Sequence, residues 1–258
     1  MMTPSTQPSS PSTSLSPELD RQDWRTTRLR DLQSPTGNLA LIETRWLEPN
    51  AAAADLSDAE ILAGFPDTVT VTRLTRSNLE TNEPEHGLRF WDSHSPAIAS
   101  FDTVSIFDYD PDWVIEADFT PAASGRTVQF EHIRDNGGSR ALAVPGDITF
   151  ERAGISYRLS AFDDGGVLLL VFGDATNGAD DDSGTYAAGR FLFVERPASA
   201  TEFTAAGPVR LDFNKAFVPP CGFSAQYNCP LPPAQNRFAI PVKAGERAVR
   251  FTDGYTLQ

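Results

Sequence analysis

The chain has 258 residues, of which 40% are hydrophobic, so it can bury the core of one large or two small domains. Its formal net charge of −14 repels phosphate backbones and anionic lipid head groups, and we expect neither nucleic acid nor a membrane as a partner. The longest apolar run, residues 167–172, falls far short of the roughly 20 residues that a membrane helix requires.

The N-terminal residues 1–16 form a tail rich in Ser, Thr and Pro. We predict that this tail is disordered, because such residues bury too little surface to offset the entropy of ordering. It has neither the cationic start nor the apolar centre of a secretory signal, so a cytoplasmic location is predicted.

Two short helices are predicted near the N-terminus. The first covers residues 17–32, because Ser16 can cap it while Pro17 takes the first helical position. The second begins with the capping box of residues 57–60 and stops at Gly64. The segment between them is predicted to be extended over residues 38–47.

From residue 67 onward, apolar and polar residues alternate with a period of about two, which is typical of strands. The Asp/Gly cluster at residues 163–166 predicts a tight hairpin. We therefore predict an all-β fold, mainly an antiparallel barrel or sandwich, with one or two short N-terminal helices and a single domain over residues 17–258. The expected strands cover residues 69–72, 88–91, 113–119, 128–132, 148–150, 155–159, 167–172, 190–195, 209–213 and 238–242.

The C-terminal half carries an unusual series of polar, Pro and Cys motifs. They read Gly-Arg-Phe-Leu at 189–192, Leu-Asp-Phe-Asn-Lys-Ala at 211–216, Pro-Pro-Cys at 219–221, Cys-Pro-Leu-Pro-Pro at 229–233, Asn-Arg at 236–237 and Ala-Gly-Glu at 244–246. This series resembles the signature of DUF1684, a bacterial and archaeal domain of unknown function. Further similarity is found around Trp24, Trp46, Gly146 and Asp174. The resemblance implies a mainly β domain and carries no catalytic assignment.

Arg190 and Asp212 are predicted to form an ion pair. Arg190 shares a strand face with Leu192 and Val194, which indicates a partly buried guanidinium in need of a carboxylate. Asp212 and Asn214 point to one side of another predicted strand, and Asp212 is the expected partner. The pair is interpreted either as a buried bridge that fixes strand register or as a clamp on a ligand carboxylate or phosphate.

A pocket for a small polar or anionic molecule is predicted near this pair. One alternative is an enzyme, such as a hydrolase, with His132 or Asp212 as base; another is a structural or interaction protein in which the polar residues only tie loops to strands. An open cavity would favour the first two readings and solid packing the third. No catalytic residue, metal or cofactor is assigned, and the oligomeric state is left open. The candidate ligand-binding residues are Tyr186, Arg190, Asp212, Asn214, Asn236, Arg237 and His132.

The two cysteines, Cys221 and Cys229, lie in a Pro-rich loop with seven residues between them. This spacing does not fit a zinc knuckle, so we predict reduced, buried thiols that pack the loop. A nucleophilic Cys221 would need a base such as His132. His132 is itself interpreted as a hydrogen-bonded core residue, whereas His86 and His94 are expected at the surface.

Residues 174–182 superficially resemble a calcium loop, because oxygen-bearing side chains alternate around a glycine. The twelfth place holds Thr185 in place of an acid, and the glycine stands one place too early. We predict a solvated acidic loop that binds no calcium. The chain also has no Gly-rich phosphate loop, no Gly-x-Ser-x-Gly elbow and no His-Glu-x-x-His segment.

Overall fold

The structure is a computed structural model that describes residues 16–48, 56–77, 83–133, 139–197, 203–252 and 254–257. The tail predicted at residues 1–16 lies almost entirely outside the described residues. The helices are α1 (Pro17–Leu32), α2 (Asp58–Ile61) and α3 (Pro96–Ser100). No helix of the described residues is long and apolar enough to cross a membrane.

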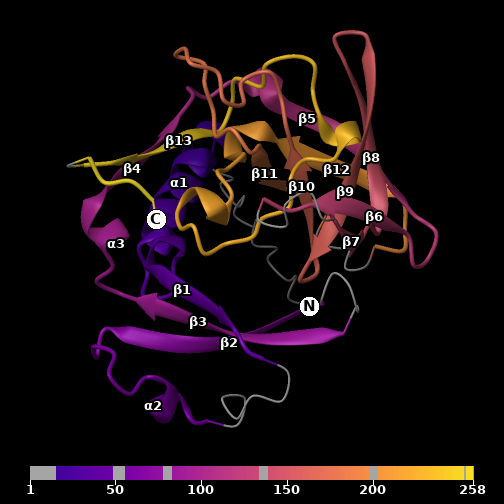
Figure 1. Cartoon of the computed structure of the whole chain (residues 1–258). Coiled ribbons are helices and arrows are strands. Elements are labelled where there is room, and N and C mark those ends of the chain that lie inside the picture. The colour runs from indigo at the N-terminus through magenta and orange to yellow at the C-terminus, as the bar shows by residue number, and fades with distance from the viewer. Residues whose placement is uncertain are drawn as a thin grey trace, which may run out of the picture.

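Strands are the main regular secondary structure of the described residues (Figure 1). They are β1 (Leu41–Trp46), β2 (Val69–Ser77), β3 (Pro84–Asp92), β4 (Phe101–Ile106), β5 (Val114–Pro121), β6 (Thr127–Glu131), β7 (Ser139–Ala143), β8 (Gly146–Arg152), β9 (Ile155–Asp164), β10 (Val167–Phe172), β11 (Arg190–Phe193), β12 (Gly207–Asp212) and β13 (Glu246–Phe251). The prediction of a mainly antiparallel β fold is confirmed.

The largest sheet is a six-stranded half-barrel with the order β11-β10-β9-β8-β5-β12, in which all neighbours are antiparallel. Its two edges approach one another where Glu195 and Arg210 exchange backbone hydrogen bonds of 3.0 and 2.9 Å. The interior is filled by apolar side chains, including the perpendicular rings of Phe172, Phe213 and Phe238. The inward faces of the strands therefore form the main core.

A second core lies on the outer face of the half-barrel. Leu169 and Val171 of β10 point into it, opposite the interior face of that strand, and Phe130 of β6 packs there against Phe162. Burial on both faces explains why β10 is a continuous apolar run instead of an alternating one. The β6–β7 hairpin and the Cys-bearing loop cover this side.

The three-stranded sheet β1-β3-β2 lies below the half-barrel in Figure 1, with α2 on its far side. One face of this sheet packs against residues of and after α2, such as Ile61 and Phe65. Leu41 and Trp91 reach the second core. The small β4–β13 sheet lies beside α1 (Figure 1).

Both predicted N-terminal helices form with their N-terminal caps, and α2 ends at Ile61, before the predicted stop at Gly64. Ser16 accepts a hydrogen bond from the Leu19 backbone at 3.4 Å, and Ser57 and Glu60 form the expected capping box. The hairpin between β9 and β10 also forms as predicted, with Asp164 opposite Val167.

The strand predicted at residues 238–242 does not form. The backbone of Val242 bonds instead to the side chains of Asp174 and Arg190. The strand predicted at 209–213 ends at Asp212, because residues 213–215 turn into a 3-10 helix. Side chains that satisfy backbone groups thus replace sheet pairing in the motif-bearing half.

Candidate functional site

The position of Arg190 depends on the glycine before it. Gly189 has a φ of +92°, and a Cβ at this residue would lie 2.5 Å from the Pro232 side chain and 2.7 Å from the Phe172 carbonyl oxygen. Only glycine accommodates both the backbone conformation and this close approach. The turn lets β11 start at Arg190, which pairs with Phe172 at the end of β10.

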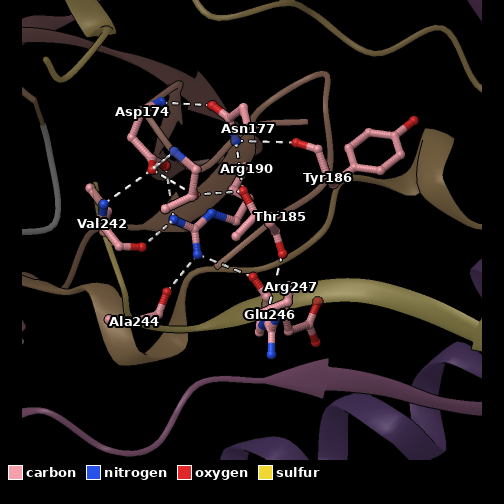
Figure 2. A network of polar contacts seen from close by, with 11 residues as sticks. Asp174, Asn177, Thr185, Tyr186, Arg190, Val242, Ala244, Glu246 and Arg247 are labelled. Atoms are coloured by element: carbon pink, nitrogen blue, oxygen red, sulfur yellow. Dashed lines mark hydrogen bonds and ion pairs between the residues drawn. The ribbon is translucent and has the colours of Figure 1, made fainter. Parts of the chain in front are cut away.

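The guanidinium of Arg190 is the centre of a buried polar network (Figure 2). Its Nη1 donates to the carbonyl oxygens of Ala244 and Glu246 at 2.5 and 3.1 Å. Its Nη2 donates to the carbonyl oxygen of Val242 at 2.7 Å and to Oδ2 of Asp174 at 2.9 Å. The residue is 0% exposed, and all four N–H groups of its two terminal nitrogens are hydrogen-bonded within the protein.

Asp174 is the carboxylate partner of Arg190, and the predicted pairing with Asp212 is wrong. The Asp174 side chain is 0% exposed, and its Oδ1 accepts hydrogen bonds from Thr176 and from the Val242 backbone. Burial lowers the pKa of Arg190, and the charge of Asp174 opposes that shift. The prediction that Arg190 is buried and paired is confirmed, but its partner comes from the loop after β10.

Asp212 lies in a separate buried cluster. Its Oδ1 accepts hydrogen bonds from the backbone and the side-chain amide of Asn214 at 3.1 and 3.0 Å. Asn214 in turn bonds both backbone groups of Asp110 at 2.8 and 2.9 Å, which ties the loop before β5 to the motif. Burial acts to lower the pKa of Lys215, but its contacts with the carboxylates of Asp20 and Glu195 raise it above the ordinary lysine value.

Glu246 connects the motif to α1. Its side chain is 3% exposed, and its Oε1 lies 3.3 Å from Nε of Arg28. The other oxygen accepts a hydrogen bond of 2.8 Å from the Val218 backbone, and Arg28 donates to the Val218 carbonyl oxygen at 2.9 Å. Gly245, with a φ of +78°, lets this turn approach the carbonyl oxygens of Ala216 and Phe213. The Ala-Gly-Glu motif therefore holds the helix against the sheet.

Asn236 bridges β9 and β10 at the point where their pairing has ended. Its amide nitrogen donates to the carbonyl oxygens of Ser160 and Val171 at 2.8 and 2.9 Å, and its oxygen accepts from the Ser160 backbone at 2.9 Å. The residue is 0% exposed, whereas Arg237 beside it is exposed. The two neighbours therefore do not share one pocket.

Tyr186 and the cysteines form a further contact. The Tyr186 hydroxyl donates to Sγ of Cys221 at 3.5 Å, and the Cys221 backbone donates to Sγ of Cys229 at 3.2 Å. Both cysteines are buried free thiols. His132 is buried, with Nδ1 3.1 Å from the Phe130 carbonyl oxygen, as expected for a core histidine.

We expect the thiols of the native protein to react with Ellman's reagent about tenfold or more slowly than those of the denatured protein near about pH 8. The side-chain hydrogen bond between Cys229 and Cys221, together with burial, raises the pKa of Cys229, which disfavours the reactive thiolate. Thiol titration after denaturation should find both groups free. A stoichiometric disulfide in protein alkylated during purification would contradict this expectation.

The acidic residues 180–182 are exposed, as predicted for the loop after β10. The loop is ordered from within: Asn177 accepts a hydrogen bond from the Asp174 backbone at 2.6 Å, and Thr176 bonds Thr185 at 2.8 Å. The first carboxylate of the calcium-like pattern, Asp174, is buried on Arg190.

We expect calorimetric titration with calcium to show no tight binding, because Asp174 cannot leave Arg190 without a large electrostatic cost. Titration with magnesium, another divalent cation, is the control. A submicromolar calcium site that Asp180→Ala abolishes would overturn this prediction.

A second polar cluster lies on the outer face of β8 and β9. Asp147, whose side chain is 3% exposed, accepts hydrogen bonds from Nη1 of Arg126 at 2.7 Å, from Nε and Nη2 of Arg158 at 2.8 and 2.6 Å, and from the Ser160 hydroxyl at 3.0 Å. Burial acts to raise the pKa of Asp147, but the hydrogen bonds from Arg126, Arg158 and Ser160 lower it below its usual value. Gln235, which directly precedes the Asn236-Arg237 motif, donates to the Ser160 hydroxyl.

A cavity of about 600 Å³ opens beside this cluster at the end of β5 and β8. Arg126 and Asp163 are its charged lining residues, and Val144, Pro145 and Phe203 contribute apolar surface. A smaller cavity of about 330 Å³ lies on the three-stranded sheet. Neither cavity is lined by the residues proposed from sequence, whose ligand-binding role stays a prediction.

The sequence reasoning did not select the Arg126 cluster. Arg158 and Ser160 alternate along β9 with buried apolar residues, a pattern that predicts a solvent-facing side. The pairing of β8 with β9 places Asp147 directly opposite Ser160, and this register is not visible in either strand alone.

Comparison with known proteins gives a family without an assigned activity. Residues 99–247, more than half of the chain, match the family described as "Protein of unknown function (DUF1684)". The solution NMR structure of an uncharacterized protein from Haloarcula marismortui is 32% identical, covers 57% of this chain and 77% of that chain, and has a TM-score of 0.45. No curated protein matches the chain. The N-terminal part of the sequence resemblance, around Trp24 and Trp46, lies outside the matched range. The matched range includes the whole late motif series up to Glu246. The chain therefore belongs to the DUF1684 family.

Proposed function

We propose that the protein binds a small molecule in the cavity beside Arg126. The observation that carries this proposal is the cavity itself, whose volume of about 600 Å³ falls within the range of ordinary ligand sites. Its surface combines apolar side chains with one positioned arginine, which is the usual composition of such sites.

The contrast between two arginines supports this cavity, and not Arg190, as the proposed site. Arg190 is 0% exposed, and its terminal N–H groups are all bonded to the protein. The side chain of Arg126 is 30% exposed and lines an open cavity. A ligand at Arg190 would have to break bonds to the motif backbone, whereas a ligand at Arg126 would displace solvent.

A structural or interaction role is the second candidate, and the solid packing around Arg190, Asn214 and Asn236 favours it. These side chains tie loops to strands, which accounts for the polar motifs without a ligand. The two candidates are compatible, because the motifs can maintain the fold while a different surface binds. No contact of the described residues favours the hydrolase alternative, since His132 and Asp212 are both buried within protein contacts.

A metabolite screen by thermal shift tests the proposed function. A ligand present at 100 times its Kd adds about 2.7 kcal/mol of stability, which raises Tm by several degrees. Ala143→Trp places a large side chain at the cavity wall and should abolish the shift. Ala187→Trp, at an exposed alanine two residues before Gly189, is the matched control and should retain it.

The proposal fails if the screen yields no ligand, or if Ala143→Trp leaves the shift of every ligand intact. A shift that only Ala187→Trp removes would return the site to the Arg190 side of the molecule.

A further inference from the structure

We infer that Arg126 binds an oxyanion, the carboxylate or phosphate group of a ligand whose remaining body is mainly apolar. This inference rests on the proposed function and adds the chemical class of the ligand.

Arg126 retains the donors that an oxyanion needs. An arginine side chain has about five N–H groups. Among the described residues, Nη1 of Arg126 bonds Asp147 at 2.7 Å and Nη2 bonds the Ser160 hydroxyl at 3.1 Å. These contacts hold the guanidinium by one side and leave N–H groups that can form the paired hydrogen bonds typical of arginine with carboxylate and phosphate.

The charges around Arg126 favour an anion. Asp147 is contacted by two arginines, Arg126 and Arg158, so one positive charge remains uncompensated within this group of three. The Asp147 carboxylate is buried and fixed by four hydrogen bonds, which positions Arg126 without a change on binding. In a chain with a net charge of −14, this is a local site of opposite sign.

Asp163 is the acid at the cavity and opposes this attraction. Its Oδ1 accepts a hydrogen bond of 2.6 Å from the Gly166 backbone in the β9–β10 turn, and the residue is exposed. Solvent therefore screens its charge more than that of Arg126. The rest of the lining, including Val144, Pro145 and Phe203, suits an apolar ligand body.

Gln235, which directly precedes the Asn236-Arg237 motif, reaches this site through one hydrogen-bonded chain. Gln235 donates to the Ser160 hydroxyl, which donates to Asp147 and accepts from Arg126. Gln235 and Ser160 are thus positioning residues for the arginine. This connection runs from the residue before the Asn236-Arg237 motif to Arg126, although no motif residue lines the cavity.

The experiment compares benzoate, phenyl phosphate and the neutral benzamide, which share an aromatic body and differ in charge. Binding is followed by two-dimensional amide NMR at ligand concentrations up to about 10 mM, where weak sites with Kd near 1 mM are measurable. We expect benzoate or phenyl phosphate to shift the amides of residues 122–126 and to bind about tenfold or more tightly than benzamide. The stronger of the two anions tells a carboxylate from a phosphate site.

Four variants sharpen the result. Arg126→Gln should reduce anion binding to the level of benzamide, and Arg126→Lys should restore part of it by keeping the charge. Asp163→Asn should strengthen anion binding, because it removes a repelling charge from the cavity. Arg158 also bonds Asp147 but does not line the cavity. Arg158→Gln should therefore weaken anion binding only about two- to threefold. The folding of each variant is checked by circular dichroism.

Equal affinity for benzamide and the two anions, or anion binding that survives Arg126→Gln, overturns the oxyanion inference while the proposed cavity stands. If no probe shifts the amides of residues 122–126 and the metabolite screen also yields nothing, the proposed function fails and the inference fails with it.

Discussion

Asp174→Ala is expected to lower the free energy of unfolding by about 3–5 kcal/mol, because it leaves the charge of Arg190 buried without a partner. Arg190 is 0% exposed, and Asp174 is its carboxylate at 2.9 Å. The same variant removes the acceptor of the Thr176 and Val242 hydrogen bonds. Urea unfolding at equilibrium measures the loss as a lower midpoint.

Two further variants distinguish the loss of the Arg190–Asp174 ion pair from a general effect of changing this loop. Asp181→Ala removes an exposed carboxylate from the same loop and should leave the midpoint unchanged within error. Asp174→Asn preserves the shape and one acceptor oxygen, so its loss should be smaller than that of Asp174→Ala. An Asp174→Ala protein as stable as the parent would show that the Arg190 network does not hold the fold.

Asn236→Ala is expected to cost about 2–4 kcal/mol. The variant leaves the buried amide of Ser160 and the carbonyl oxygens of Ser160 and Val171 without their partner. Each such orphaned group costs roughly 1–3 kcal/mol, and losses at neighbouring groups do not add in full. The measurement is again urea unfolding, together with amide hydrogen exchange of β9 and β10.

Asn236→Asp tests the hydrogen bonds at constant volume, because it turns the donor toward the two carbonyl oxygens into an acceptor. We expect it to be at least as damaging as Asn236→Ala. Gln33→Ala is the matched control: this exposed amide donates once, to the Leu29 carbonyl oxygen at 3.0 Å, and its loss should stay within about 0.5 kcal/mol. Faster exchange of the β9 and β10 amides in Asn236→Ala alone would show that the Asn236 side chain holds these two strands together. Unchanged exchange would argue against this role.

The candidate site was only partly predictable from the sequence. Apolar neighbours at alternating places along its strand correctly indicated that Arg190 is buried. They did not reveal its partner, because Asp174 lies 16 residues away in a loop that was read as solvated. Asp212, the acid predicted because of its place on an apolar strand, instead accepts hydrogen bonds from Asn214 at the end of that strand.

The Arg126 cluster was invisible for a different reason. Arg126 follows β5, Asp147 is on β8 and Ser160 is on β9, and each looks like an ordinary polar surface residue in its own segment. Their convergence depends on the register of β8 with β9 and on the loop that returns beside them. Both are long-range pairings that no local pattern contains.

The sequence by itself determined the family, the antiparallel β class, the capped N-terminal helices and the β9–β10 hairpin, because alternation, caps and turn residues act over a few neighbours. Only the tertiary structure decided which acid neutralises Arg190, which backbone groups the motif side chains satisfy, and where a cavity remains open. These depend on residues far apart in the chain, and a buried charge or polar group accepts whichever partner the packing brings within hydrogen-bond distance.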